Sequence, residues 1–319
     1  MTDLRVGTRG SALALWQTER VRGLLQSLGV GTERIEIRTT GDVILDVPLS
    51  QIGSRALFTK QLDDALLDGQ IDLAVHSLKD LPTVLPAGLA LGAVGLREDP
   101  RDALVGKGPL LWSDVPQGAT VATSSLRRRA QVLRARPDLL VDDIRGNVDT
   151  RLAKLDRSPV WTAIFLATAG LERLGFGHRI GERMPTSIML PAPGQGALAI
   201  TIRMDDPRTG ALVQRALHDP DCARAVAAER GFLRRLEGGC QVPVAALATV
   251  SGDELRLRGR VIALDGRSAV EGEWVGPAAS EAHAADAGQS LAEQLLSRGA
   301  GEILQAVRDG SGAHAAPGA

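Results

Sequence analysis

Cysteine and histidine are scarce in this sequence, and their scarcity excludes two common ways of stabilising a fold. Two cysteines in 319 residues make no disulfide framework, and five scattered histidines without paired cysteines argue against a structural zinc site. The sequence also lacks any apolar run long enough to cross a membrane, and its N-terminus has no basic head followed by an apolar core. We therefore expect a cytoplasmic protein that binds neither metal nor membrane.

An excess of charge of one sign is missing as well. The net charge of -1 provides no basic field for nucleic acid, while 44% hydrophobic and 24% charged residues are typical of a globular protein with room for more than one domain. Lysine is rare: only four of the 37 Lys and Arg residues are lysine. Either the codon usage of a GC-rich genome or a need for guanidinium groups that bind carboxylates and phosphates would explain this bias.

The stretch IDLAVHSLKDLPT, residues 71–83, has the most suggestive order of residues. A short apolar run typical of a buried strand is followed at once by Ser77, Lys79 and Asp80. Ligands of open α/β sheets bind just past the carboxyl ends of strands, so these side chains would be placed for chemistry. A solvated turn before Pro82 explains the same residues, and His76 is compatible with simple core packing.

Arginines recur at predicted strand-to-helix corners. The first corner follows a strand over 4–7, with Ser11 where a helix N-cap belongs, and a second strand is predicted over 35–39. At the later SSLRR corner, two cations in the first helical turn oppose the helix dipole, which favours a shared anion. The corner arginines are Arg9, Arg127, Arg128, Arg145, Arg151 and Arg173. Codon usage does not select strand ends, so these positions predict a ligand with several carboxylates or phosphates.

Three other segments carry alternatives that the sequence leaves open. PAPGQGA, residues 191–197, predicts a constrained crossing between domains or a tight turn. A helical pattern over 223–236 ends at EGGC, where Cys240 is either a reactive or modified loop thiol or a buried small residue. Phe58 suits core packing or stacking on a flat ligand. Alternating segments from residue 242 onward predict a small antiparallel sheet, with a final helix over 284–296.

Five motifs occur in one order: HSLKD, SSLRR, RGN-VDTR, PAPGQGA and EGGC-QVP. With them the chain resembles the porphobilinogen deaminase (hydroxymethylbilane synthase) family from TRGS to QVP. The chain departs from the family pattern at Ser54-Arg55-Ala56, where Gly-Lys-Gly is usual. The resemblance implies an α/β protein with two periplasmic-binding-protein-like α/β domains, a cleft between them, and a smaller α+β C-terminal domain. The expected boundaries are 1–95 with 195–215 for domain 1, 96–194 for domain 2, 216–306 for domain 3, and 307–319 for a disordered tail.

The resemblance also implies an activity. Members add four porphobilinogen units, each with loss of ammonia, to a dipyrromethane primer, and hydrolysis then releases hydroxymethylbilane for haem and other tetrapyrroles. Each pyrrole ring carries two carboxylates, which corner arginines would bind. The primer would be a cofactor held by a thioether to Cys240, with Asp80 as the catalytic residue. Further implied cofactor-binding residues are Ser77, Lys79, Asp80, Ser125, Arg127, Arg128 and Arg145, and implied substrate-binding residues are Arg9, Ser11, Arg55, Phe58, Arg151 and Arg173. We expect a monomer whose partner is the small substrate.

Two other functions compete with this one. A cytoplasmic two-lobed polyanion-binding module without catalysis would also place arginines at strand ends, but it would have no use for a reactive Cys240. A phosphate-handling transferase is disfavoured, because the sequence contains no G-x-x-x-x-G-K pattern.

Overall fold

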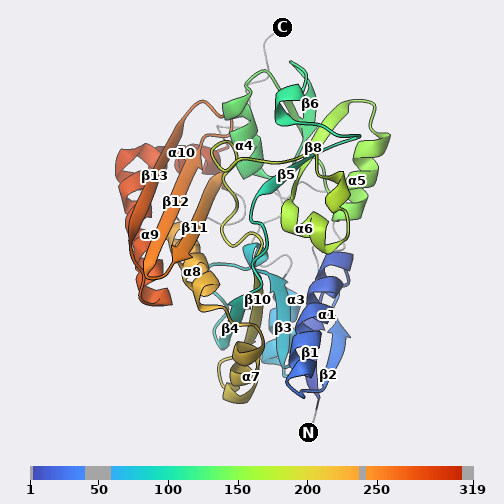
Figure 1. The fold of residues 1–319 in the computed structure, drawn as a ribbon. Coiled ribbons are helices and arrows are strands. Elements are labelled where there is room, and N and C mark those ends of the chain that lie inside the picture. Colours follow the sequence, from blue (N-terminus) through green and yellow to red (C-terminus); the bar gives the residue numbers. More distant parts are fainter. Residues whose placement is uncertain (1–2, 40–58, 237–241, 311–319) are drawn as a thin grey trace.

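The computed structural model describes residues 3–39, 59–236 and 242–310. In these ranges the strands form three sheets, of which two have five strands and one has three. The two five-stranded sheets lie one above the other, and the three-stranded sheet stands beside them (Figure 1). Each sheet packs with helices around apolar residues of its own.

The first lobe is the part of the chain around the sheet that contains the N-terminal strand. The strands, in sheet order, are β2 (Thr32–Glu36), β1 (Leu4–Thr8), β3 (Leu73–Ser77), β10 (Leu198–Arg203) and β4 (Leu89–Gly95). The first three are mutually parallel, and β10 is antiparallel to both of its neighbours. The helices are α1 (Ala12–Ser27), α3 (Lys60–Leu67) and α7 (Pro207–Leu217), with the turn η2 (Leu78–Asp80) directly after β3.

One strand of this lobe differs from its prediction. The sequence predicts the second strand over 35–39, whereas β2 spans Thr32–Glu36. β2 lies at the edge of the sheet, where most of its side chains face solvent, so its sequence shows no clear alternation. Pairing with β1 fades at Ile37, whose N–H still donates to the carbonyl of Thr8 at 2.8 Å.

The second lobe repeats the same plan. Its strands, in sheet order, are β7 (Leu140–Asp142), β6 (Thr120–Ala122), β8 (Trp161–Ala167), β5 (Asp102–Gly106) and β9 (Glu182–Arg183). Its helices are α4 (Leu126–Ala135), α5 (Val148–Arg157) and α6 (Thr168–Arg173), with the turns η3 (Trp112–Asp114) and η4 (Gly177–Arg179). In each lobe the fourth strand of the sheet arrives from the other lobe and runs antiparallel to its neighbours.

Two segments therefore cross between the lobes, and glycine fixes how closely they approach each other. The backbone N–H of Glu98 in the first crossing donates to the carbonyl of Gly196 in the second at 3.2 Å. Gly196 has φ +88°, and a Cβ there would lie 2.5 Å from the carbonyl oxygen of Glu98. Gly194 has φ +74°, and its Cβ would collide with Leu78. The prediction of PAPGQGA as a crossing segment is confirmed.

The C-terminal unit packs helices against a three-stranded antiparallel sheet, as the alternating segments predict. Its elements are α8 (Pro220–Arg235), β11 (Val244–Ser251), β12 (Glu254–Ile262), β13 (Ala269–Pro277), α9 (Glu281–Leu295), η5 (Leu296–Ala300) and α10 (Gly301–Arg308). Phe232, Leu257 and Leu291 are fully buried in its core. α10 extends to Arg308, so it covers the first two residues of the predicted tail, and 311–319 lie outside the described ranges.

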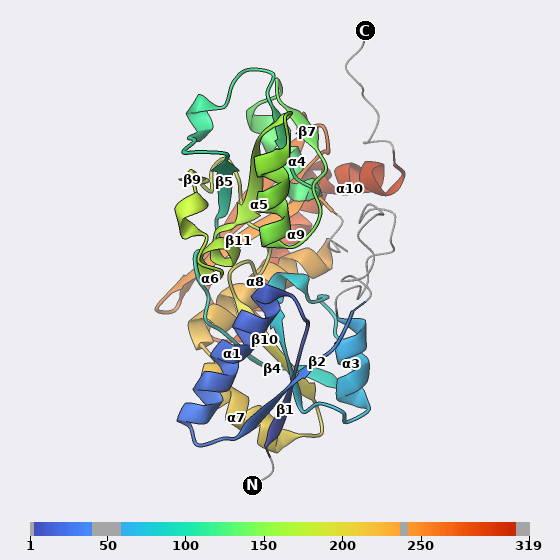
Figure 2. The ribbon, with the colours of Figure 1, turned by 90° about the vertical axis from the view of Figure 1, so that its right-hand side faces the viewer.

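The fold class predicted from the sequence is confirmed: two α/β lobes are joined to a smaller α+β unit. Figure 2 shows the first lobe below and the second lobe above, with α8 between them. No helix of the described ranges combines the length and the apolar character needed to cross a bilayer.

Candidate active site

The first lobe presents a polar corner at the end of β3. Leu78 and Leu81 are buried and belong to one apolar cluster with Ala223 of α8. This packing holds the turn between them in place. Lys79 and Asp80 lie in this turn and are partly buried. Lys79 Nζ donates to Gln195 Oε1 at 3.3 Å, whereas the carboxylate of Asp80 accepts no hydrogen bond from the described residues. The corner is rigid, but Asp80 keeps its acceptor capacity for a ligand.

The facing corner of the second lobe is built around a buried carboxylate. Asp102, the first residue of β5, is fully buried. Its Oδ2 accepts from Arg127 Nη1 at 2.6 Å, and its Oδ1 accepts from Arg128 Nε at 2.9 Å. Arg127 also donates to the carbonyl of Leu190, and Arg128 to that of Phe165, both at 2.8 Å. The two arginines of the SSLRR motif are thus held by the protein itself.

The charges at this corner decide which groups stay ionised. Burial alone would raise the pKa of Asp102, but the charges and hydrogen bonds of Arg127 and Arg128 outweigh it and hold that pKa well below its usual range. Burial lowers the pKa of Arg128, and repulsion from Arg127 adds to this, because two guanidinium groups share one carboxylate. The cluster keeps an excess of positive charge.

Gln195 joins the two corners. Its Nε2 donates to Asp102 Oδ1 at 3.0 Å and to the carbonyl of Pro100 at 2.7 Å, while its Oε1 accepts from Lys79. Burial lowers the pKa of Lys79 to about 8; nearby Asp80 opposes that shift, and Arg128 adds to it. The ammonium group of Lys79 is therefore only partly protonated in mildly alkaline solution.

The corner between β7 and α5 adds two more guanidinium groups. Arg151 Nε donates to the carbonyl of Gly146 at 2.7 Å. Burial lowers the pKa of Arg151 to about 10; the charges of Arg128 and Arg145 add to the shift, and that of Asp80 opposes it. Arg145 Nη1 is buried and has no hydrogen-bond partner among the described residues. A buried donor without an acceptor is unfavourable, so an anionic ligand beside Arg145 would stabilise the site.

Other predicted site residues are engaged with the protein. Ser11 and Ser125 are helix N-caps, and their hydroxyls accept the N–H groups of Ala14 and Arg128. The N-cap prediction for Ser11 is confirmed. Ser77 Oγ accepts from Gln17 Nε2 at 2.8 Å.

Arg9 and His76 lie near each other at the end of the first-lobe sheet. Burial lowers the pKa of His76 to about 3, and the charge of Arg9 contributes. His76 Nε2 lies 2.9 Å from Thr201 Oγ1 on the neighbouring strand. His76 is therefore a neutral core residue, as the packing alternative predicts.

Arg173 lies at the crossing segments. Its Nε donates to Glu98 at 2.9 Å, its Nη2 donates to the carbonyl of Gly196 at 2.7 Å, and its guanidinium stacks over the Trp16 ring at 5.6 Å. The remaining predicted residues, Arg55, Phe58 and Cys240, lie outside the described ranges.

Sequence reasoning missed two residues that organise the site. Asp102 is the partner of both SSLRR arginines, and Gln195 connects that pair to Lys79. The sequence offers a weak signal for Asp102, because a lone aspartate that opens an apolar strand must pair with a buried cation. For Gln195 the sequence offers no signal beyond its place between two glycines.

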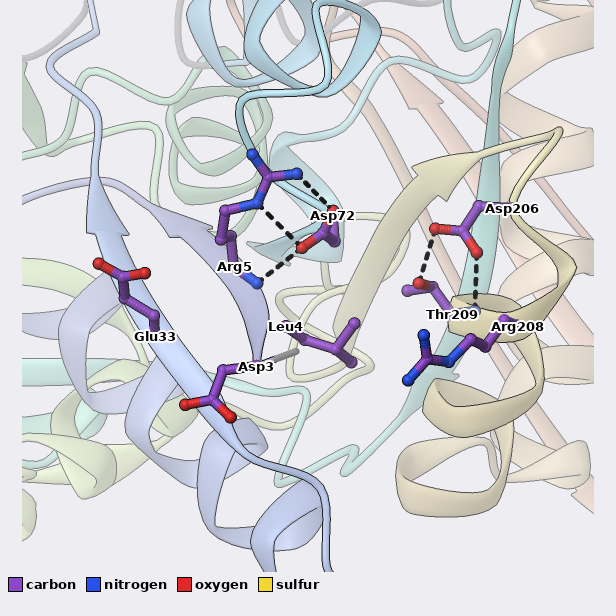
Figure 3. A pocket seen from close by; sticks show the side chains of 8 residues that line it. All are labelled: Asp3, Leu4, Arg5, Glu33, Asp72, Asp206, Arg208 and Thr209. Carbon is purple, nitrogen blue, oxygen red and sulfur yellow. Dashed lines mark hydrogen bonds and ion pairs between the residues drawn. The ribbon is translucent and has the colours of Figure 1, made fainter. Parts of the chain in front are cut away.

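A separate hollow in the described surface lies elsewhere. Its volume is about 500 Å³, and it is lined by Arg5, which is paired with Asp72, and by Asp206, which caps α7 (Figure 3). It opens at the amino ends of β1 and β3, whereas ligands of such sheets bind at the carboxyl ends. We therefore place the candidate site at the two corners and not in this hollow.

The fold and the site define a class: a two-lobed α/β protein with a cation-rich cluster at the strand ends where its lobes meet. Sequence models of one family match most of the chain. The model described as "Porphobilinogen deaminase, dipyrromethane cofactor binding domain" matches residues 4–211, and that of the porphobilinogen deaminase C-terminal domain matches residues 223–297. The chain belongs to the porphobilinogen deaminase family, whose members are transferases of tetrapyrrole synthesis.

Relatives of the same family match over nearly the whole length. The porphobilinogen deaminase of Moorella thermoacetica is 52% identical over 98% of this chain and 99% of its own. That of Geobacter metallireducens is 49% identical over 96% of this chain and 95% of its own. Among solved structures, a periplasmic substrate-binding protein from Coxiella burnetii matches 67% of this chain and 91% of its own with 15% identity and a TM-score of 0.43.

Proposed function

We propose that this protein is a hydroxymethylbilane synthase. It adds porphobilinogen units one after another to a dipyrromethane primer, releases ammonia at each addition, and frees hydroxymethylbilane by hydrolysis. The observation that carries the proposal is the placement of Asp80, a carboxylate without hydrogen bonds from the described residues, beside Lys79, Arg128 and Arg151. A substrate with two carboxylates per ring needs several fixed cations, and its chemistry needs one free carboxylate.

The residues at the two corners fit a dipyrromethane group. The buried Nη1 of Arg145 has no acceptor among the described residues, and burial lowers the pKa of Lys79 to about 8, where its nearest hydrogen-bond partner is the neutral amide of Gln195. Carboxylates of the group would satisfy both. Bound through Cys240, the group supplies the primer end to which new units are joined. We propose that Ser77, Lys79, Ser125, Arg127, Arg128 and Arg145 hold it.

Asp80 is the proposed catalytic residue. Its carboxylate can accept a pyrrole N–H, stabilise positive charge that develops on the ring, and carry a proton between successive steps. η2 holds it, because Leu78 and Leu81 are buried on either side. Lys79 and Arg151 lie near enough for their charges to be coupled to it, so they orient carboxylates around the same point.

We also propose substrate-binding residues, a cellular location and domain bounds. Arg9, Ser11, Arg55, Phe58, Arg151 and Arg173 are the proposed substrate-binding residues. We propose a cytoplasmic monomer with domains at 1–95 and 195–215, 96–194, and 216–306; the membership of β10 in the first-lobe sheet supports the discontinuous first domain.

Intact-mass measurement of the purified protein tests the proposal. We expect a mass excess of two pyrrole units in protein made where substrate is available, and its loss in Cys240→Ser. Cys222→Ser is the matched control, because Cys222 is buried in α8 and burial raises its pKa to about 12, which keeps the thiol unreactive.

Two results would reject the proposal. One is an unmodified Cys240 in protein made with substrate present. The other is a purified protein that binds polycarboxylates but releases no ammonia from porphobilinogen, which would favour the polyanion-binding module instead.

A further inference from the structure

Arg260 of β12 is a buried arginine that reaches out of its own sheet. Its residue is 6% exposed. Nε donates to Glu271 at 2.7 Å, Nη1 to Gln131 Oε1 at 3.1 Å and to the carbonyl of Ile188 at 3.3 Å, and Nη2 to the carbonyl of Ser187 at 3.0 Å. Nη2 also pairs with Glu271. Three of these four hydrogen bonds reach the second lobe.

The contact with Gln131 leads directly to the anion-binding arginines. Gln131 lies on α4, one turn after Arg127, and is buried. Its Oε1 accepts the N–H of Leu190 at 2.8 Å, and its Nε2 donates to the carbonyl of Leu190 at 3.0 Å. That same carbonyl accepts from Arg127 Nη1 at 2.8 Å. Arg260 is therefore connected to Arg127 through Gln131 and Leu190.

Neighbouring contacts seat the C-terminal unit on the same surface. Arg258 Nη1 donates to Thr186 Oγ1 at 3.2 Å. The turn after β12 lies directly against α4, because a Cβ on Gly266 would be 2.4 Å from the backbone nitrogen of Arg134. Arg260 is buried at this contact and lies outside the apolar core cluster of its own unit.

We propose that Arg260 is a positioning residue that fixes Arg127 for carboxylate binding by docking the C-terminal unit onto α4 and the 187–190 segment. The inference rests on the proposed function, in which Arg127 holds carboxylates of the primer.

The test compares holoenzyme variants on one strand. Arg260→Leu removes the donors, and Arg256→Leu is the matched control because Arg256 pairs with Glu273 at 2.9 Å on the exposed face of β12, with 51% of its side chain exposed. Arg260→Lys keeps the charge beside Glu271 but not the planar fork, and it serves if the leucine variant fails to fold. The measurements are amide hydrogen exchange of peptides covering 126–135 and 186–191, and KM and kcat for porphobilinogen.

We expect faster exchange in both peptides and a rise in KM of roughly three- to tenfold with little change in kcat for Arg260→Leu and Arg260→Lys, and neither effect for Arg256→Leu. If Arg260 acts through Gln131, the double variant with Gln131→Leu has the KM of Gln131→Leu alone. Unchanged KM and exchange, or KM effects that multiply in the double variant, would overturn the inference. If the wild-type protein and Arg256→Leu both fail to turn over porphobilinogen, the proposed function is rejected. The exchange data alone would then decide whether Arg260 positions α4 and the 187–190 segment.

Discussion

The two corners of the site use charge in opposite ways. In the second lobe Arg127 and Arg128 are bound by Asp102 and by backbone carbonyls, so their positions are fixed before any ligand arrives. In the first lobe Lys79 has one long hydrogen bond to a neutral amide, and Asp80 has none from the described residues. In the proposed function, the second-lobe corner binds carboxylates with prearranged cations, and the first-lobe corner supplies groups that can exchange protons.

The difference has an energetic side. A buried ion pair contributes little net stability, because desolvation of both ions opposes their attraction, but loss of one partner leaves a buried charge uncompensated. We therefore expect removal of the carboxylate to destabilise the second-lobe corner, and we expect the first-lobe corner to tolerate substitution without unfolding. Variants at the two corners should separate stability from turnover.

Asp80→Asn should have the largest effect. Turnover of porphobilinogen should fall by about 10²–10⁴-fold, the usual range for loss of an acid–base group, while the melting temperature stays near that of the wild-type protein. Asp68→Asn, at the exposed end of α3, is the control. Near-normal turnover in Asp80→Asn would remove the distinction between the corners.

Asp102→Asn should instead lower stability. The free energy of unfolding should fall by about 3–5 kcal/mol, because Arg127 and Arg128 would remain buried without their carboxylate. The control is Asp138→Asn, which breaks the more exposed Arg136 pair of the same lobe and should cost far less stability. Chemical denaturation measures both, and equal losses would show that burial of Asp102 makes no difference.

Lys79→Arg should change the pH dependence of kcat/KM, and this is the smallest of the three effects. Because the pKa of Lys79 is about 8, kcat/KM should fall as pH rises through that value, by roughly two- to tenfold between pH 7 and 9, and Lys79→Arg should lack this decline.

As pH rises, the free energy of unfolding should change in the direction opposite to kcat/KM. The unfolded chain, with a lysine pKa of 10.5, binds more protons than the folded chain between pH 8 and 10.5, so this residue makes the wild-type protein more stable as pH rises there. Lys107→Arg, at an exposed lysine, is the control. An alkaline decline that persists unchanged in Lys79→Arg would assign it to another group.

Much of the local structure could be predicted from the chain. Ser11 begins its helix, PAPGQGA crosses between the lobes, and the alternating C-terminal segments pair as an antiparallel sheet, because each depends on nearby residues. The edge strand β2 was predicted three residues too late, since exposed edge strands lack a clear burial pattern. Sequence motifs also singled out Arg127 and Arg128, but not Asp102, the carboxylate that holds both of them.

The sequence by itself determined the chemical groups: corner arginines, an aspartate after a buried strand, and the motifs that place the chain in its family. Only the tertiary structure decided how those groups are used. Asp102 is hydrogen-bonded to Arg127 because β5 is paired antiparallel with β8. Gln195 is hydrogen-bonded to Asp102, 93 residues earlier, because the two crossing segments lie together. Such partners are set by packing between distant segments, and the ionisation of a buried charge depends on its partner more than on its own identity.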